Sequence, residues 1–240
     1  MDRLGLHLST GEHIDGLWVG TCENEPEPIL RRLKEALYLI KTHDPLRYQR
    51  LTRDLKRVWA LSIQYPTAYF DRRLDACMLN TQFVLAEDST PELIASSIVH
   101  EATHARLESY GIVYEEVRRP RIEGICVRRE LAFSAKLPNG QQVHEWAEHK
   151  LTSYCNHASL TNAALTKRQL DQIDEELRRL GVPPWIVGMV RVLGQAIRGV
   201  MRVVRGARVP PAKESRSVVL KPFRQKTWMR GSSPRMTNKM

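Results

Sequence analysis

The stretch STPELIASSIVHEATH, residues 89–104, carries the strongest signal for the fold of this chain, because it holds both a helix start and a chemical motif. Ser89 and Glu92 have the spacing of a capping box, and Pro91 suits the first position of a helix. Gly111 is placed to end that helix. Apolar residues recur on one broad face between these limits, at Leu93, Ile94, Ile98 and Leu107. The pattern predicts a long helix that packs against a core.

The same helix carries an H-E-x-x-H motif, formed by His100, Glu101 and His104. Two residues that are four apart differ by about 40° around a helix, so both imidazoles project from one face and can hold one metal ion. The intervening glutamate lies beside that ion. A second cluster, with His144 and His149, has histidines five residues apart, which point about 140° away from each other. The sequence therefore predicts a zinc site at residues 100–104.

The third ligand of this site is expected further along the chain. Catalytic zinc usually binds three protein ligands and keeps a fourth position for water. No histidine follows His104 at the spacing of a third ligand on an extended motif, so a carboxylate is expected. Glu123 and Glu130 lie seven residues apart on one face of the next predicted helix. We expect Glu123 to be the ligand, because it is nearer the turn, and Glu130 to orient a histidine or to replace Glu123 as ligand.

With these residues the chain resembles the gluzincin group of zinc metallopeptidases, in its compact form, over roughly residues 55–137. The resemblance implies a zincin-like domain that hydrolyses peptide bonds, with Glu101 as general base. It also implies that an edge strand binds an extended peptide or protein substrate, and Cys77 to Leu85 is the candidate edge. One position departs from the family, because Val127 stands where an aspartate usually supports the first histidine. Glu130 is the candidate for that supporting role.

The resemblance also implies a residue that donates a hydrogen bond to the reacting carbonyl oxygen, where negative charge develops. No residue of this chain clearly matches that role. Tyr154 and His157 are the candidates, with His144 and His149 as further alternatives. Each of these could equally be an ordinary residue on a helix surface.

Around this motif the periodicity predicts an α+β fold in which a small mixed sheet packs against helices. Short apolar runs separated by turn residues predict three or four strands, at residues 58–63, 68–70, 76–79 and 83–85. Helical spacing predicts further helices at residues 28–41, 45–57, 121–136, 142–157 and 166–180. We expect a single zincin-like domain over residues 1–183, followed by a helical C-terminal extension.

The charge of the chain is concentrated in its last quarter. Residues 184–240 hold 13 of the 37 Lys and Arg but one of the 27 acidic residues, a balance of +12, whereas the preceding residues carry −2. Within residues 184–208, four arginines share one face, which predicts a basic amphipathic helix; residues 209–240 are expected to be disordered. An anionic membrane surface or a nucleic acid is the candidate partner of this segment, and the alternative is that the helix packs on the body with its arginines in water.

Four cysteines without a C-x-x-C pair indicate a reduced, cytoplasmic protein, peripheral at the membrane if the basic segment binds lipid. The first residues lack the apolar core of a secretory signal, so no export is expected. Two other classes of function stay open on the sequence. One is a catalytically silent regulatory or binding module that a fourth protein ligand closes around the metal. The other is an adaptor that acts through the basic segment.

Overall fold

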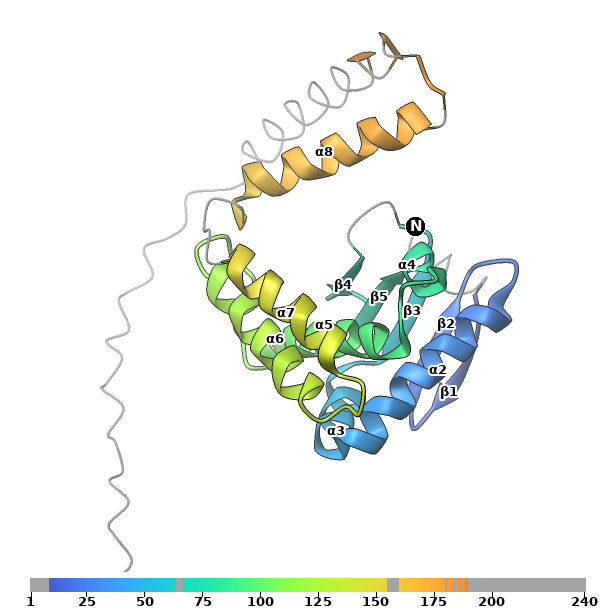
Figure 1. Cartoon of the computed structure of the whole chain (residues 1–240), viewed down its shortest axis with the longest axis vertical. Helices are drawn as coiled ribbons and strands as arrows, with labels where there is room; N and C mark the ends of the chain where they lie inside the picture. Colours follow the sequence, from blue (N-terminus) through green and yellow to red (C-terminus); the bar gives the residue numbers. More distant parts are fainter. Residues whose placement is uncertain are drawn as a thin grey trace, which may run out of the picture. The chain divides into compact units, whose positions relative to one another are not determined.

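The computed structural model describes residues 9–63, 67–154, 160–179, 181–183, 185–186 and 188–189. Within these residues the chain forms a mixed α+β fold with a five-stranded sheet and seven helices (Figure 1). The predicted α+β class is therefore confirmed. The predicted basic helix lies almost entirely outside the described residues, and the predicted tail lies wholly outside them.

The sheet is mixed, with the strand order β1-β2-β3-β5-β4. Its outer pairs, β1 with β2 and β4 with β5, are antiparallel, whereas β3 runs parallel to both of its neighbours. The strands are β1 (Thr10–Ile14), β2 (Leu17–Thr21), β3 (Arg57–Leu61), β4 (Ala68–Asp71) and β5 (Ala76–Asn80).

The hairpin of β1 and β2 was not predicted. Its two-residue turn consists of Asp15 and Gly16, both with positive φ, 50° and 83°. A turn of this kind matches the right-handed twist of the flanking strands, and an Asp-Gly pair is its usual sequence signal. The sequence therefore contains a local signal for this hairpin.

The predicted edge strand was wrong. Residues 76–80 form β5, which pairs with β3 on one side and with β4 on the other, and every residue of β5 is buried. An unbroken apolar run is typical of a strand that is covered on both faces, so it does not belong at an edge. Residues 83–85 are not a strand either, because they belong to helix α4 (Thr81–Leu85). The edge on this side of the sheet is β4.

The other helices are present where the periodicity predicts them, with shifted ends. They are α2 (Pro26–His43), α3 (Pro45–Asp54), α5 (Pro91–Ser109), α6 (Arg119–Ser134), α7 (Gln141–Tyr154) and α8 (Asn162–Arg179). The Thr90 side chain caps α5 by accepting a hydrogen bond from the amide of Leu93 at 3.3 Å. The predicted start of α8 at Thr166 was wrong, because Thr161 caps the helix by accepting from the amide of Ala164 at 3.2 Å.

The two faces of the sheet carry different clusters, because side chains alternate along each strand. Val58 and Ala60 of β3, with Cys77 and Leu79 of β5, belong to the main core together with apolar residues of α2 and α5. The alternating residues, among them Trp59 and Met78, form a smaller cluster on the other face.

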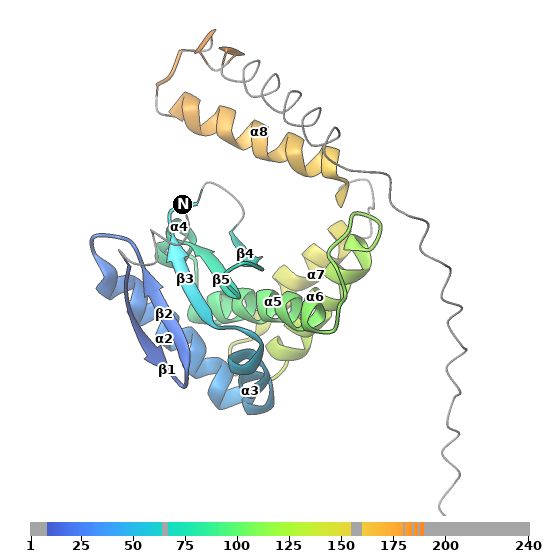
Figure 2. The same ribbon diagram turned by 180° about the vertical axis from the view of Figure 1, so that it is seen from behind.

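Helix α5 lies between two layers. It packs against α2, α3, β4 and β5, and also against α6 and α7. Figure 2 shows α6 and α7 beside α5 and away from β1 and β2. The H-E-x-x-H residues of α5 lie beside α6, across a space that strand β4 also borders.

Candidate metal centre

Helix α5 brings the two histidines of the motif together. The rings of His100 and His104 have centroids 5.0 Å apart and planes at 56°. His100 and Glu101 are buried, with 6% and 7% of their surface exposed. The helix ends one turn later, where Gly111 adopts a φ of 75° and its amide donates to the carbonyl of Glu108 at 2.8 Å. The predicted helix end at Gly111 is thereby confirmed.

Helix α6 places two glutamates on opposite sides of the His100 ring. Glu123 Oε2 lies 3.2 Å from His100 Nε2, and Glu123 Oε1 lies 3.6 Å from His104 Nε2. Glu130 Oε1 lies 2.5 Å from His100 Nδ1. The structure therefore brings Glu123 to the Nε2 atoms of both histidines, and it places Glu130 behind His100.

These distances fit the geometry of a metal site. Ligand atoms about 2.05 Å from a tetrahedral zinc ion lie about 3.3 Å from one another. The separations of 3.2 and 3.6 Å between Glu123 and the two Nε2 atoms are close to that value. A hydrogen bond at Nδ1 is also the usual way in which a protein orients a histidine ligand.

Cys126 is a further donor that the sequence analysis did not single out. The ligand atoms of His100, His104 and Cys126 all lie within 4.8 Å of one another, so this group could hold a metal ion. Cys126 lies three residues after Glu123, one turn along the same face of α6, and its side chain is fully buried. The spacing from Glu123 was the signal that could have found it.

Glu130 is held by residues of helices α5 and α7. Ser96 of α5 donates to Glu130 Oε2 at 3.0 Å, and Lys150 Nζ of α7 lies 3.3 Å from the same oxygen. The Lys150 ammonium also lies 3.5 Å from the ring centroid of Trp146. Lys150 therefore brings a positive charge to a cluster of three buried carboxylates, those of Glu101, Glu123 and Glu130.

Tyr114 completes the cluster from the connection between α5 and α6. Its hydroxyl donates a short hydrogen bond to Glu123 Oε1. Its ring meets that of His104 edge to face, with centroids 5.2 Å apart and planes at 88°. Nothing in the local sequence identifies this tyrosine, because it lies in a segment without helical or strand periodicity.

The buried groups shift each other's pKa values. Burial raises the pKa of Glu101 to about 7, against the opposing charge of His100. Burial alone would lower the pKa of His100, but its hydrogen bonds to Glu123 and Glu130 outweigh it and raise that pKa to about 10. Burial, with the charge of His100, lowers the pKa of His104 to about 4. Without metal, His100 is therefore the protonated histidine.

Glu123 and Cys126 are shifted in opposite directions. Burial alone would raise the pKa of Glu123, but its hydrogen bond with His100 and the charges of both histidines outweigh it and lower that pKa to about 2. Burial, and then the charge of Glu123, raise the pKa of the Cys126 thiol. At neutral pH and without metal, Glu123 is thus an ionised donor, whereas Cys126 is a neutral thiol.

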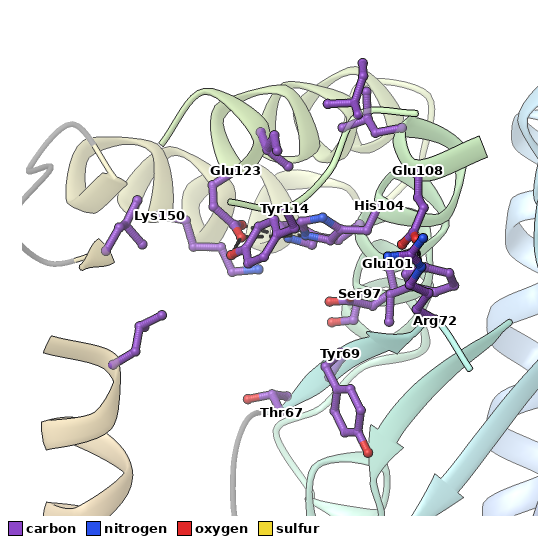
Figure 3. A pocket seen from close by; sticks show the side chains of 18 of the residues that line it. Thr67, Tyr69, Arg72, Ser97, Glu101, His104, Glu108, Tyr114, Glu123 and Lys150 are labelled. Carbon is purple, nitrogen blue, oxygen red and sulfur yellow. Dashed lines mark hydrogen bonds and ion pairs between the residues drawn. The ribbon is translucent and has the colours of Figure 1, made fainter. Parts of the chain in front are cut away.

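The cluster opens into a cavity of about 650 Å³ that extends to the edge strand β4. Figure 3 shows His104, Tyr114 and Glu123 gathered on one side of this cavity, with Thr67 and Tyr69 opposite them. Arg72, just after β4, forms an ion pair with Glu108 of α5. The lining is largely apolar away from the motif and includes Phe70, Leu107, Ile112, Val113 and Leu165.

Of the four predicted carbonyl donors, the structure describes the side chains of two, His144 and His149, and neither lines this cavity. His144 and His149 are exposed on α7, where His144 lies 3.4 Å from Glu148 and 3.2 Å from Ser134. The side chain of Tyr154 and all of His157 lie outside the described residues. The valine at position 127 is fully buried, and Glu130 contacts His100 as the sequence analysis expected.

No known protein-family model, curated protein or solved structure matches this chain. Among the helices within the described ranges, none has the length and apolar content needed to cross a membrane.

Proposed function

We propose that this chain is a zinc-dependent peptidase of the gluzincin type, with a zincin-like domain. The observation that carries the proposal is the position of Glu123, whose two oxygens lie 3.2 and 3.6 Å from the Nε2 atoms of His100 and His104. His100, His104 and Glu123 would hold the ion, which leaves a fourth position open toward the cavity. A zinc ion bound there supplies the polarisation of a substrate carbonyl and the acidification of water.

The protein's own groups are suited to the proton transfers of hydrolysis. Glu101 lies beside the two histidines and its pKa is raised to about 7 by burial, so it can both accept and release a proton near neutral pH. It would take a proton from the attacking water and pass it to the leaving amine. Tyr114 lines the same cavity, and its hydroxyl donates to Glu123 Oε1.

The cavity favours an extended peptide as substrate. Among the described residues, strand β4 pairs with β5 alone, and it lines the cavity with Ala68, Tyr69 and Phe70. An unpaired strand edge can bind a peptide through main-chain hydrogen bonds. The apolar walls at Ile112 and Val113 favour a substrate with an apolar side chain near the cleaved bond.

The proposal is tested by the zinc content of the purified protein, measured by plasma mass spectrometry beside that of variants. We expect about one zinc per chain, lost in Glu123→Ala and kept in Glu145→Ala, an exposed glutamate on α7. Glu130→Ala should weaken binding without abolishing it, because Glu130 contacts the ring nitrogen on the far side of His100. No metal in the wild type, and none taken up on addition of zinc, would refute the proposal.

A closed, catalytically silent metal module is the second candidate, and the position of Cys126 favours it. A thiolate from Cys126, added to the two histidines and Glu123, would fill the fourth position. Glu130 is a poor fourth ligand because it contacts His100 Nδ1 instead. Cys126→Ser separates the two functions: retained zinc and peptide hydrolysis support the peptidase, whereas loss of zinc supports the closed module.

We also propose a polyanionic partner for residues 184–240, on the basis of their charge balance of +12. This partner is tested by replacing the four arginines at positions 191, 198, 202 and 205 with glutamine in the full chain. Weaker sedimentation with anionic vesicles would support a membrane surface, and weaker retardation of nucleic acid would support the alternative. Unchanged binding in both assays would reject the partner.

A further inference from the structure

Arg119 is buried at a position that is unfavourable for a cation. It is the first residue of α6, where the helix dipole places partial positive charge, and 7% of its surface is exposed. Burying a guanidinium costs free energy unless hydrogen bonds replace its water. Arg119 Nε has no hydrogen-bond partner within the part of the chain that the structure describes. The contacts of Arg119 must therefore offset the cost of its burial.

The contacts of Arg119 lead to the start of α8. Its Nη1 donates to the carbonyl of Leu160 at 2.5 Å, and its Nη2 donates to Asn162 Oδ1 at 2.7 Å. Asn162 in turn donates to Glu116, from its amide at 2.8 Å and from Nδ2 at 2.7 Å. Arg119, at the start of α6, and Glu116, in the connection before it, thus both bind Asn162, the first residue of α8. Arg119 also binds Leu160, two residues before Asn162.

The other face of the guanidinium leads to the metal centre. Arg119 Cζ lies 5.1 Å from the ring centroid of Tyr114, a cation–π contact. The hydroxyl of the same tyrosine donates to Glu123 Oε1, and its ring packs edge-on against His104. A planar guanidinium can stack on a ring while its edge donates two hydrogen bonds, which an ammonium cannot do.

We propose that Arg119 is a positioning residue, which orients the metal ligand Glu123 through Tyr114 and fastens the start of α8 as a wall of the cavity. Leu160 and Leu165 line the cavity from this wall, so the same arginine serves the ligand and the cavity. The inference rests on the proposed function, because it takes Glu123 to be a zinc ligand. Partners that orient a ligand commonly change metal affinity by about 10- to 100-fold when they are removed.

The test uses the full chain, with Arg119→Lys, Tyr114→Phe and their combination. Zinc affinity is measured by competition with a chromophoric chelator, and the absorption bands of bound Co²⁺ report the ligand geometry. We expect Arg119→Lys and Tyr114→Phe each to weaken zinc binding about 10- to 100-fold and to shift the cobalt bands. The combination should bind zinc no more weakly than Tyr114→Phe alone, because Arg119 acts through Tyr114.

Two further variants keep the inference open to refutation. Arg121→Lys, at an exposed arginine of the same helix, should leave zinc affinity and cobalt bands unchanged. Asn162→Ala removes one partner of Arg119 at an exposed position, so it should fold even if Arg119→Lys does not, and should weaken zinc binding by a smaller factor.

The outcomes separate this inference from the proposed function. Zinc bound by the wild type with unchanged affinity and cobalt bands in the variants would overturn the role of Arg119 and leave the metal site intact. Fully additive losses in the combined variant would overturn the route through Tyr114. A wild type that binds no zinc would overturn both.

Discussion

The two sides of α5 are built on different principles. One side carries Ile94, Ile98 and Val99, fully or almost fully buried in the main core against α2 and the sheet. The other side carries His100, which is also buried, with 6% of its surface exposed, but contacts Glu123 and Glu130 of α6. Apolar burial has no direction, so core side chains need only volume and shape. The polar side depends on individual atoms, each of which needs its own partner.

Stability and chemistry therefore depend on different sides of the same helix. Burial of the apolar side supplies the free energy of folding, at about 25 cal/mol per Å² of apolar surface. The polar side gathers three buried carboxylates around the buried His100, which costs free energy. We therefore expect substitutions on the apolar side to change stability, and those on the polar side to change metal binding and catalysis.

The largest effect is expected for Glu101→Gln. Loss of the proposed general base should lower the rate of peptide hydrolysis about 10²- to 10⁴-fold, measured with a fluorogenic peptide. Zinc content should be unchanged. The melting temperature should not fall, because the variant removes a buried carboxylate whose ionisation burial opposes. Glu145→Gln is the matched control, and hydrolysis at the wild-type rate in Glu101→Gln would exclude this mechanism.

Removal of a ligand is the next largest effect. His104→Ala should lower zinc affinity by at least about 100-fold, because two remaining ligands bind the ion weakly. His149→Ala, at an exposed histidine of α7, should have no effect. Both variants are compared by titration against a chelator. Equal zinc affinities in the two variants would remove His104 from the site.

On the apolar side, Ile98→Ala should lower the free energy of unfolding by about 2 to 5 kcal/mol, because it leaves a cavity in the core. Ile98 is fully buried, two residues before His100. Urea unfolding measures the loss, and zinc titration of the folded variant should match that of the wild type. A weaker zinc site in the folded variant would show that the two sides of α5 are not independent.

The pH dependence of zinc affinity tests the polar side of α5. Hydrogen bonds to Glu123 and Glu130 raise the pKa of His100 to about 10, so this imidazole carries a proton at pH 7 when no metal is bound. Binding must release that proton, and zinc affinity should fall about tenfold for each unit that the pH is lowered near neutrality. Calorimetry in buffers of different ionisation enthalpy should detect release of about one proton. No proton release would contradict the assignment of His100.

The smallest effect is expected at Asp44, a buried carboxylate outside the metal centre. Burial alone would raise its pKa, but hydrogen bonds from Arg47 and Lys136 outweigh it and lower that pKa below its ordinary value of 3.8. A carboxylate with a lowered pKa stabilises the fold above 3.8, and this contribution is lost as the pH falls through the lowered pKa.

Asp44→Asn should therefore cost about 1 to 3 kcal/mol at pH 7 and lose less stability on acidification than the wild type. Urea unfolding at pH 7 and at pH 3 measures both effects. Equal losses of stability on acidification in the wild type and in Asp44→Asn would show that Asp44 does not contribute to acid unfolding. Zinc affinity should be the same in the wild type and in Asp44→Asn.

The elements that sequence could predict are those with local causes. Pro91 and Gly111 mark the ends of α5 because a proline fits the first helical turn and a glycine fits a positive φ. The hairpin turn at Asp15 and Gly16 had an equally local signal. The strand at residues 83–85 failed because a short apolar run does not distinguish a strand from a helix, and the position of β5 within the sheet depends on pairing with distant residues.

Local sequence is enough to predict the H-E-x-x-H helix and the shared face of His100 and His104, because helical spacing sets the direction of side chains four residues apart. Which glutamate meets both Nε2 atoms and which lies behind His100 depends on the packing of α6 against α5. The same is true of Tyr114, Cys126 and Lys150, which reach the centre from other segments. Contacts of this kind depend on how helices pack, and packing is set by the whole core rather than by any local pattern.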